Sequence, residues 1–251
     1  MNKMSMDYPI IGRSIRLDNS IEEEIRFSNI NGFSFHQIWY KDGEIAINNI
    51  DGPKEKVLIR YNFPFIIHAL IDISELNYHS NVLLGKIEYF NHNEVIIHPV
   101  YRNKIPTNDI KKTFIEDIYN ISELYYKHGI EVYLENNSKL ESIHNNEEDI
   151  MKMHTKCEKL NMVLDIAHMD SYENLKRLID IKYPNILHIS DKHFSAIHEH
   201  LPIGEGEIDW KYVFDKLLPN YAGKIIFEVS QSDDQIVKSK KIINRILIEE
   251  V

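Results

Sequence analysis

Short apolar stretches rich in β-branched residues recur along the chain and alternate with longer segments of mixed polarity. A stretch of this length, bounded by turn-forming residues, is typical of a strand buried on both faces, as in a parallel sheet. The pattern therefore predicts eight strands. They fall within residues 8–15, 33–40, 64–71, 93–100, 130–137, 161–169, 185–192 and 223–230.

The segments between these strands have the spacing of amphipathic helices. In residues 108–129, apolar side chains recur three and four positions apart, and Gly129 ends the helix before the next strand. Residues 171–184 begin on a serine and end at a proline, and residues 232–250 form a last helix. Residues 41–62 fit a hairpin as well as a helix, so the second unit is the least defined.

Eight strand–helix units in 251 residues match the size of a (β/α)₈ TIM barrel. The alternative is an open, doubly wound sheet, which ranks lower because no GxGxxG motif follows the first strand. No linker, low-complexity tract or abrupt change of charge divides the sequence. We therefore expect one barrel domain over residues 1–251.

Composition narrows the class of partner and the compartment. The net charge of −10 disfavours a broad basic surface for nucleic acid, although a small basic patch beside bound metal is not excluded. No apolar run is long enough to cross a membrane, and the N-terminus lacks the apolar core of a signal peptide. The single cysteine, Cys157, sits in a helical pattern and reads as a packed thiol. Together these features predict a cytoplasmic protein without a membrane partner. They leave the oligomeric state open.

Side chains that can bind metal or move protons follow six successive predicted strands. Any one of them alone is more often a boundary histidine or a capping carboxylate than a ligand. Six of the 13 histidines belong to this set, however, and strands of a barrel deliver such residues to one rim. The candidates are His68, His98, Glu135, Asp165, His168, His188, Asp191 and Glu228, with His198 and His200 in the loop after the seventh strand.

Buried carboxylates and imidazoles that converge on one point need a cation to offset their desolvation. A mixed set of histidine and acidic ligands suits Zn²⁺ or Mn²⁺, with Fe²⁺ and Co²⁺ as alternatives. Asp165 and His168 are three positions apart, so His168 must lie beyond the strand, in the loop over the mouth. His198 and His200 share parity and can point at one ion in extended backbone. Pro202 and two glycines then shape the return to a helix that starts near Asp209.

These residues resemble the xylose isomerase-like barrels, which include sugar and sugar phosphate isomerases and epimerases and endonuclease IV. The resemblance rests on a strand-end Glu, an LDxxH motif, a strand-end His, the string HEHLPIGEGEIDW and a final strand-end Glu. It covers roughly residues 60–230. The string is specific to the superfamily and not to one activity.

The resemblance implies site residues of two kinds. The isomerases and epimerases bind one divalent metal through residues that match Glu135, Asp165, His188 and Glu228, and the two glutamates act as acid and base. Endonuclease IV holds three zinc ions, whose ligands match those four together with His68, His98, His168 and His200. Its ninth ligand is an aspartate where this chain has His198, which can ligate but carries no negative charge.

Two reactions therefore stay open. The first is proton transfer next to the carbonyl of a sugar or sugar phosphate, with Glu135 and Glu228 as the catalytic pair. The second is hydrolysis of a phosphodiester, in abasic DNA or in a small molecule, which the extra histidines favour. The acidic charge favours a small carbohydrate-like substrate over DNA, so we rank proton transfer first. Asp191, Lys192 and Arg102 are the candidates for substrate contacts. A barrel that binds metal and ligand without turnover is a third possibility, but two intact glutamates make it less attractive.

Overall fold

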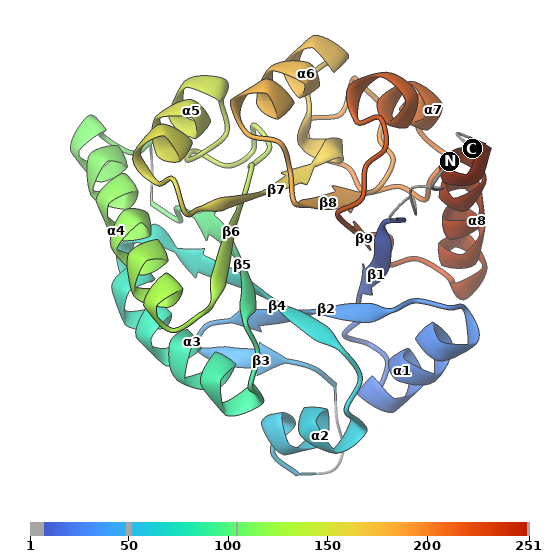
Figure 1. Ribbon diagram of the computed structural model, residues 1–251, viewed down its shortest axis with the longest axis horizontal. Coiled ribbons are helices and arrows are strands. Elements are labelled where there is room, and N and C mark those ends of the chain that lie inside the picture. Colours follow the sequence, from blue (N-terminus) through green and yellow to red (C-terminus); the bar gives the residue numbers. More distant parts are fainter. Residues whose placement is uncertain (1–7, 49–51, 104, 250–251) are drawn as a thin grey trace, which may run out of the picture.

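The structure, a computed structural model, describes residues 8–48, 52–103 and 105–249. Eight parallel strands pair side by side, and β1 pairs with both β9 and β2, so the sheet closes into a barrel (Figure 1). The barrel strands are β1 (Ile10–Ser14), β2 (Phe35–Lys41), β4 (Phe65–Asp72), β5 (Glu94–Val100), β6 (Glu131–Glu135), β7 (Asn161–Asp165), β8 (Ile186–Ile189) and β9 (Lys224–Phe227). Each of them lies within one of the eight stretches expected from the sequence, except that β2 and β4 each extend one residue beyond theirs. The (β/α)₈ prediction is confirmed.

Helices surround the barrel on its outer face (Figure 1). In the described part of the chain these are α1 (Ile21–Ile30), α2 (Lys54–Tyr61), α3 (Leu76–Phe90), α4 (Asn108–Lys127), α5 (Glu147–Lys156), α6 (Tyr172–Ile181), α7 (Trp210–Tyr212) and α8 (Asp233–Glu249). The three helices expected from spacing are α4, α6 and α8. Gly129 follows α4 with φ of 71°, as a left-handed residue that ends a helix. Helix α7 continues into a π-helical turn over Val213–Leu217.

The ambiguous segment after β2 contains both of the expected elements. Asp42 and Gly43 have φ of 51° and 87°, which is the backbone of a tight hairpin turn. This turn leads into the short antiparallel strand β3 (Glu44–Ala46), and helix α2 follows. Residues 49–51, between the hairpin and α2, lie outside the described residues.

The interior of the barrel, on the side away from its mouth at the C-terminal ends of the strands, is filled by one apolar side chain from each of seven strands. These side chains form a buried cluster of Phe35, Ile66, Ile96, Tyr133, Val163, Ile186 and Ile226. The eighth strand contributes Gly12, where a Cβ atom would lie 2.5 Å from the ring of Phe35. The glycine therefore makes room for Phe35, and the barrel is packed rather than open at this level. We call this cluster the apolar plug.

Two further predictions from the sequence concern single features. Cys157 is buried at the end of α5, and burial raises the pKa of its thiol to about 11, as a packed rather than a reactive thiol requires. In the described part of the chain, no helix combines the length and apolarity needed to cross a membrane.

Candidate metal centre and active site

Each barrel strand places one polar side chain two positions beyond its residue of the apolar plug. Because alternate residues of a strand face the same side, these side chains point into the barrel at the next level towards its mouth. They form a ring of eight polar residues directly above the plug. The ring consists of Ser14, Gln37, His68, His98, Glu135, Asp165, His188 and Glu228.

Four residues of this ring come close enough to share one ion. Ligand atoms of Glu135, Asp165, His188 and Glu228 all lie within 4.8 Å of one another. His188 is the centre of the group, since its Nδ1 is 3.1 Å from Glu135 Oε1 and 3.3 Å from Glu228 Oε1. The carboxylates of Glu135 and Asp165 and the His188 ring are buried. The structure thus brings together the four residues on which the expectation of a metal depended.

Two more histidines of the ring surround Glu135. His68 Nε2 and His98 Nδ1 lie 2.8 and 2.9 Å from Glu135 Oε2. The rings of His68 and His98 are 5.3 Å apart, and His68 also stacks on Trp39 at 4.4 Å. Glu135 is therefore enclosed by three imidazoles.

A second group of three histidines lies above the ring, at the mouth. His168 ends the 3₁₀ turn that follows β7, beyond the strand as its spacing from Asp165 required. Its ring is 5.0 Å from that of His198 and 5.6 Å from that of His200, and the latter two rings are 4.7 Å apart. His168 Nδ1 contacts the carbonyl oxygen of Asn136 at 2.8 Å, which leaves Nε2 facing the group. Each of the three rings can offer one nitrogen to a shared ion.

The ionisable side chains of the site shift one another's pKa values. Burial raises the pKa of Glu135, but His98, His188 and His68 lower it well below its ordinary value. Burial likewise lowers the pKa of His188, whereas Glu228 and Glu135 raise it to about 9. Burial, together with His200 and His168, lowers the pKa of His198 to about 4. Glu135 is therefore ionised and His198 is neutral at neutral pH, which are the forms that bind metal, whereas His188 must release its proton when an ion binds.

The donor atoms of the site fit a divalent cation. Among the described residues, no hydrogen-bond partner satisfies Asp165 Oδ2, His168 Nε2 or His188 Nε2. Unpartnered buried polar atoms are rare in native proteins, because each costs about 1–3 kcal/mol. Imidazole and carboxylate donors on one cluster are the ligand types of Zn²⁺ and Mn²⁺. Binding of an ion would satisfy these atoms and offset the buried negative charge.

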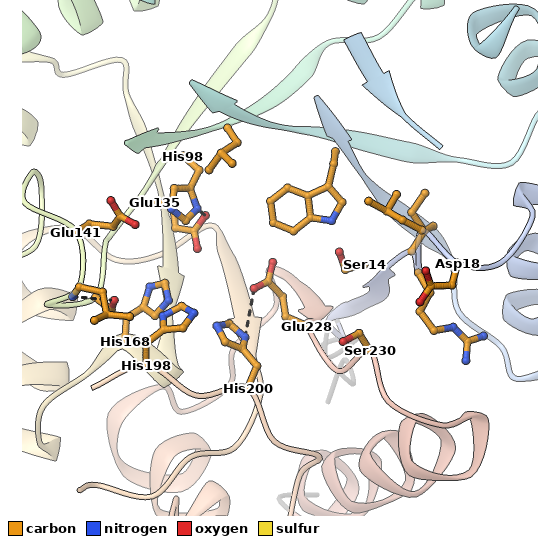
Figure 2. A pocket seen from close by; sticks show the side chains of 17 residues that line it. Ser14, Asp18, His98, Glu135, Glu141, His168, His198, His200, Glu228 and Ser230 are labelled. Atoms are coloured by element: carbon orange, nitrogen blue, oxygen red, sulfur yellow. Dashed lines mark hydrogen bonds and ion pairs between the residues drawn. The ribbon is translucent and has the colours of Figure 1, made fainter. Parts of the chain in front are cut away.

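A cavity of about 560 Å³ opens above the ring (Figure 2). His98, Glu135, His168 and His198 border it on one side, Ser14, Asp18 and Ser230 lie on the other, and His200 and Glu228 lie between the two groups. Trp39 and Leu70 line it as well. Its volume suits a small molecule rather than a duplex nucleic acid.

The three candidates for substrate contacts do not line this cavity. The buried carboxylate of Asp191 accepts hydrogen bonds from the backbone amides of Lys192, Gly204 and Ile208. Lys192 is buried and its Nζ donates to the carbonyl of Met169. Arg102 is exposed and pairs with Asp42 at 3.0 Å. Their contact with a substrate stays a prediction, and the structure gives each of them a partner within the protein.

The sequence reasoning missed three residues of the first two strands. Gln37 Nε2 donates to Glu228 Oε1 at 2.6 Å and so orients that carboxylate. Ser14 accepts from Gln37 at 3.4 Å, and Trp39 presents its ring to the cavity. The same two-residue step from the plug, at Gly12 and Phe35, could have identified them. None of the three is a metal ligand or an ionisable group, and a search for such groups passes over them.

A family model for the xylose isomerase-like TIM barrel matches residues 84–246, which is more than half of the chain. The chain belongs to this family. The match spans β5 to α8, including Glu135, Asp165, His188 and Glu228. No curated protein matches the sequence.

Several solved structures superpose over nearly the whole chain. A D-tagatose 3-epimerase-like protein is 21% identical with a TM-score of 0.73, and the match covers 96% of this chain and 97% of that one. An L-ribulose 3-epimerase is 14% identical with a TM-score of 0.75, over 96% and 95% of the two chains. The IolI protein with a bound zinc atom is 14% identical with a TM-score of 0.72, over 96% and 99%. At these identities the superpositions establish the shared fold.

Proposed function

We propose that this protein is a divalent-metal-dependent sugar isomerase or epimerase, in which Glu135 and Glu228 exchange a proton next to a carbonyl. One observation carries the proposal. Two glutamates, Asp165 and His188 converge within 4.8 Å, and both glutamates border a cavity of small-molecule size. The likeness to a D-tagatose 3-epimerase-like protein, an L-ribulose 3-epimerase and a D-allulose 3-epimerase in complex with D-allulose supports it.

The metal ligands in this proposal are Glu135, Asp165, His188 and Glu228. A divalent ion bound there would polarise the carbonyl of the substrate and so acidify the adjoining C–H group. One glutamate takes the proton from that carbon, and the other, which must first take up a proton from solvent, returns a proton to the opposite face of the same carbon or to its neighbour. Return to the same carbon inverts its configuration. Return to the neighbour moves the carbonyl, and a hydroxyl proton then passes from the oxygen of the first carbon to the oxygen of its neighbour.

The surroundings of the two glutamates suit this role. The charges of His188 and Glu135 act on Glu228 in opposite directions, and with burial the net effect is a pKa below the ordinary value. The carboxylate is therefore ionised and able to accept a proton at neutral pH. Gln37 holds one oxygen of Glu228 in place, which fixes the direction of attack. Trp39 lines the cavity beside the ring and offers an apolar face to the carbon skeleton of a sugar.

Exchange of substrate hydrogen with D₂O tests the proposal directly. With metal-loaded protein, at least one ketose should gain deuterium at the carbon next to its carbonyl, and NMR would measure the rate. Glu228→Gln or Glu135→Gln should slow this exchange at least about 100-fold. Glu205→Gln, on the loop after β8 but outside the cavity, is the matched control and should keep the wild-type rate. Absence of exchange in the wild type across pentuloses and hexuloses, or undiminished exchange in both glutamine variants, would rule out the mechanism.

A second candidate is a multinuclear phosphodiesterase, and the histidine group at the mouth favours it. A one-metal isomerase does not need His168, His198 and His200 around a separate point. Two or three ions could hold a hydroxide and stabilise a departing oxygen during hydrolysis. Cleavage of an abasic-site duplex, or of bis(p-nitrophenyl) phosphate, by the wild type but not by His98→Ala would favour this candidate.

A further inference from the structure

The end of the cavity that lies opposite His98, His168 and His198 decides which substrates fit. Figure 2 shows Ser14, Asp18 and Ser230 there, across the cavity from His98, His168 and His198. A sugar whose carbonyl lay at the metal ligands would direct its far end towards these residues. This end, which we call the distal end, is where a terminal phosphate of a sugar phosphate would have to bind.

Among the described residues, no lysine or arginine at the distal end is free to bind an anion. Among the described residues that line the cavity, Arg16 is the only lysine or arginine. Its guanidinium donates to Glu24 through Nε and Nη2, at 3.0 and 2.8 Å, and to Asp233 through Nη1 at 2.6 Å. Glu24 also pairs with the buried Arg13. Two arginines and two carboxylates cancel, so Arg16 is held as part of a neutral cluster.

Two backbone amides of the loop after β8, which contains Gly204 and Gly206, also have a hydrogen-bond acceptor within the protein. In many TIM barrels, phosphate binds to backbone amides in the loops after the seventh and eighth strands. Here the carboxylate of Asp191 takes the amides of Gly204 and Ile208. A Cβ atom on Gly206 would lie 2.4 Å from Asp191 Oδ1, so the loop is closed tightly around this carboxylate. These two amides are therefore not free to bind the phosphate group of a substrate.

The helices that follow β1 and β9, which are α1 and α8, both begin with acidic residues. Helix α1 has three glutamates in its first turn, and Ser20 with Glu23 forms a reciprocal cap that satisfies the first amides. Helix α8 begins with Asp233 and Asp234. These carboxylates neutralise the positive ends of both helices, which would otherwise attract an anion.

Asp18 adds an uncompensated negative charge. Its side chain is exposed to the cavity and has no hydrogen-bond or ion-pair partner in the part of the chain that is described. A carboxylate can accept hydrogen bonds from sugar hydroxyls, as can the hydroxyls of Ser14 and Ser230. A phosphate, which carries a charge of about −1.5 to −2 at neutral pH, would be repelled there.

We infer that the site takes an uncharged, unphosphorylated ketose, whose terminal hydroxyl Asp18 binds, and that Asp18 excludes the corresponding sugar phosphate. The inference rests on the proposed function, because it assigns the substrate class of the same site. It makes Asp18 a specificity-determining residue, because its carboxylate accepts a hydrogen bond from a hydroxyl and repels a phosphate.

Matched pairs of sugars test this. Deuterium exchange is measured for D-allulose and its 6-phosphate, and for L-ribulose and its 5-phosphate, with metal-loaded protein. The wild type should show kcat/KM at least about tenfold higher for the free sugar of the preferred pair. Asp18→Asn and Asp18→Lys should shift the ratio towards the phosphate, by at least tenfold for the lysine. Asp180→Lys, on the outer helix α6 and with the same change of charge, should leave the ratio unaltered.

The outcomes separate the inference from the function. Preference of the wild type for a phosphorylated sugar would overturn the inference and leave the isomerase or epimerase function standing. A preference for the free sugar that neither Asp18 variant alters would refute the role of Asp18. Exchange with none of the four sugars or any other ketose would remove the proposed function, and the inference with it.

Discussion

Replacing Glu24 by glutamine should cost a large part of the stability of the fold. The side chains of Glu24 and Arg13 are both fully buried and lie 2.5 Å apart. Burial raises the pKa of Glu24, but Arg13 and Arg16 outweigh this and lower it, so the carboxylate is ionised at neutral pH. Glu24→Gln preserves the shape and removes the charge. It leaves Arg13 buried with polar contacts to Ser28 and to backbone oxygens but without a counter-charge.

Breaking a buried ion pair by removing one partner typically costs about 3–5 kcal/mol. For a chain of this size that corresponds to a fall in Tm of roughly 6–20 °C. Urea unfolding followed by circular dichroism would measure it, with the exposed neighbour Glu22→Gln as the control, for which we expect less than about 1 kcal/mol. A lowered folded-state pKa gives stability that is present above the unfolded value, about 4.3, and is lost as the pH falls. The gap between wild type and Glu24→Gln should therefore narrow in acid.

A loss below about 1 kcal/mol for Glu24→Gln, or a gap that persists unchanged into acid, would show that the buried pair does not stabilise the native state as described. The neutral cluster at the distal end would then lose its physical basis as well.

Two further predictions concern buried groups outside the metal centre. Burial lowers the pKa of His36 to about 3, so the unfolded state takes up a proton first and stability should fall by about 2 kcal/mol from this residue between pH 6.5 and 5. His36→Gln should flatten that part of the urea-midpoint profile, and an unchanged slope would contradict the assignment. Asp191→Asn weakens the acceptor for the loop amides and should cost about 1–3 kcal/mol. It should also speed proteolysis between Lys192 and Asp209, and an equally resistant loop would count against the role of Asp191.

Periodicity was sufficient to predict the barrel, because each parallel strand is buried on both faces and stands out as a continuous apolar run. It was also sufficient for most of the candidate site, since a strand-end histidine or carboxylate of the right parity faces the barrel axis. His168 shows how far this goes: its spacing from Asp165 placed it beyond the strand, where the structure has it.

The rest depends on tertiary contacts that no local pattern carries. Asp191 follows β8 as a ligand would, yet its carboxylate is taken by amides from the loop that returns over it. Arg102 follows β5, but its guanidinium lies at the surface and pairs with Asp42 of the hairpin turn. Gln37 and Trp39 gain their roles only because barrel closure brings β2 near β9 through β1. The neutralisation of Arg16 likewise requires α1 and α8 to meet.

The metal content of the protein tests the central claim most directly. Protein purified without chelator and loaded with Zn²⁺ or Mn²⁺ should retain, after desalting, about one ion per chain by elemental mass spectrometry, and Asp165→Ala with His188→Ala should lose it while keeping the wild-type circular dichroism spectrum. Two or three retained ions would move the assignment to the multinuclear hydrolase. Retention of no ion by the wild type would contradict the account, because the converging carboxylates and imidazoles would then not bind a common ion.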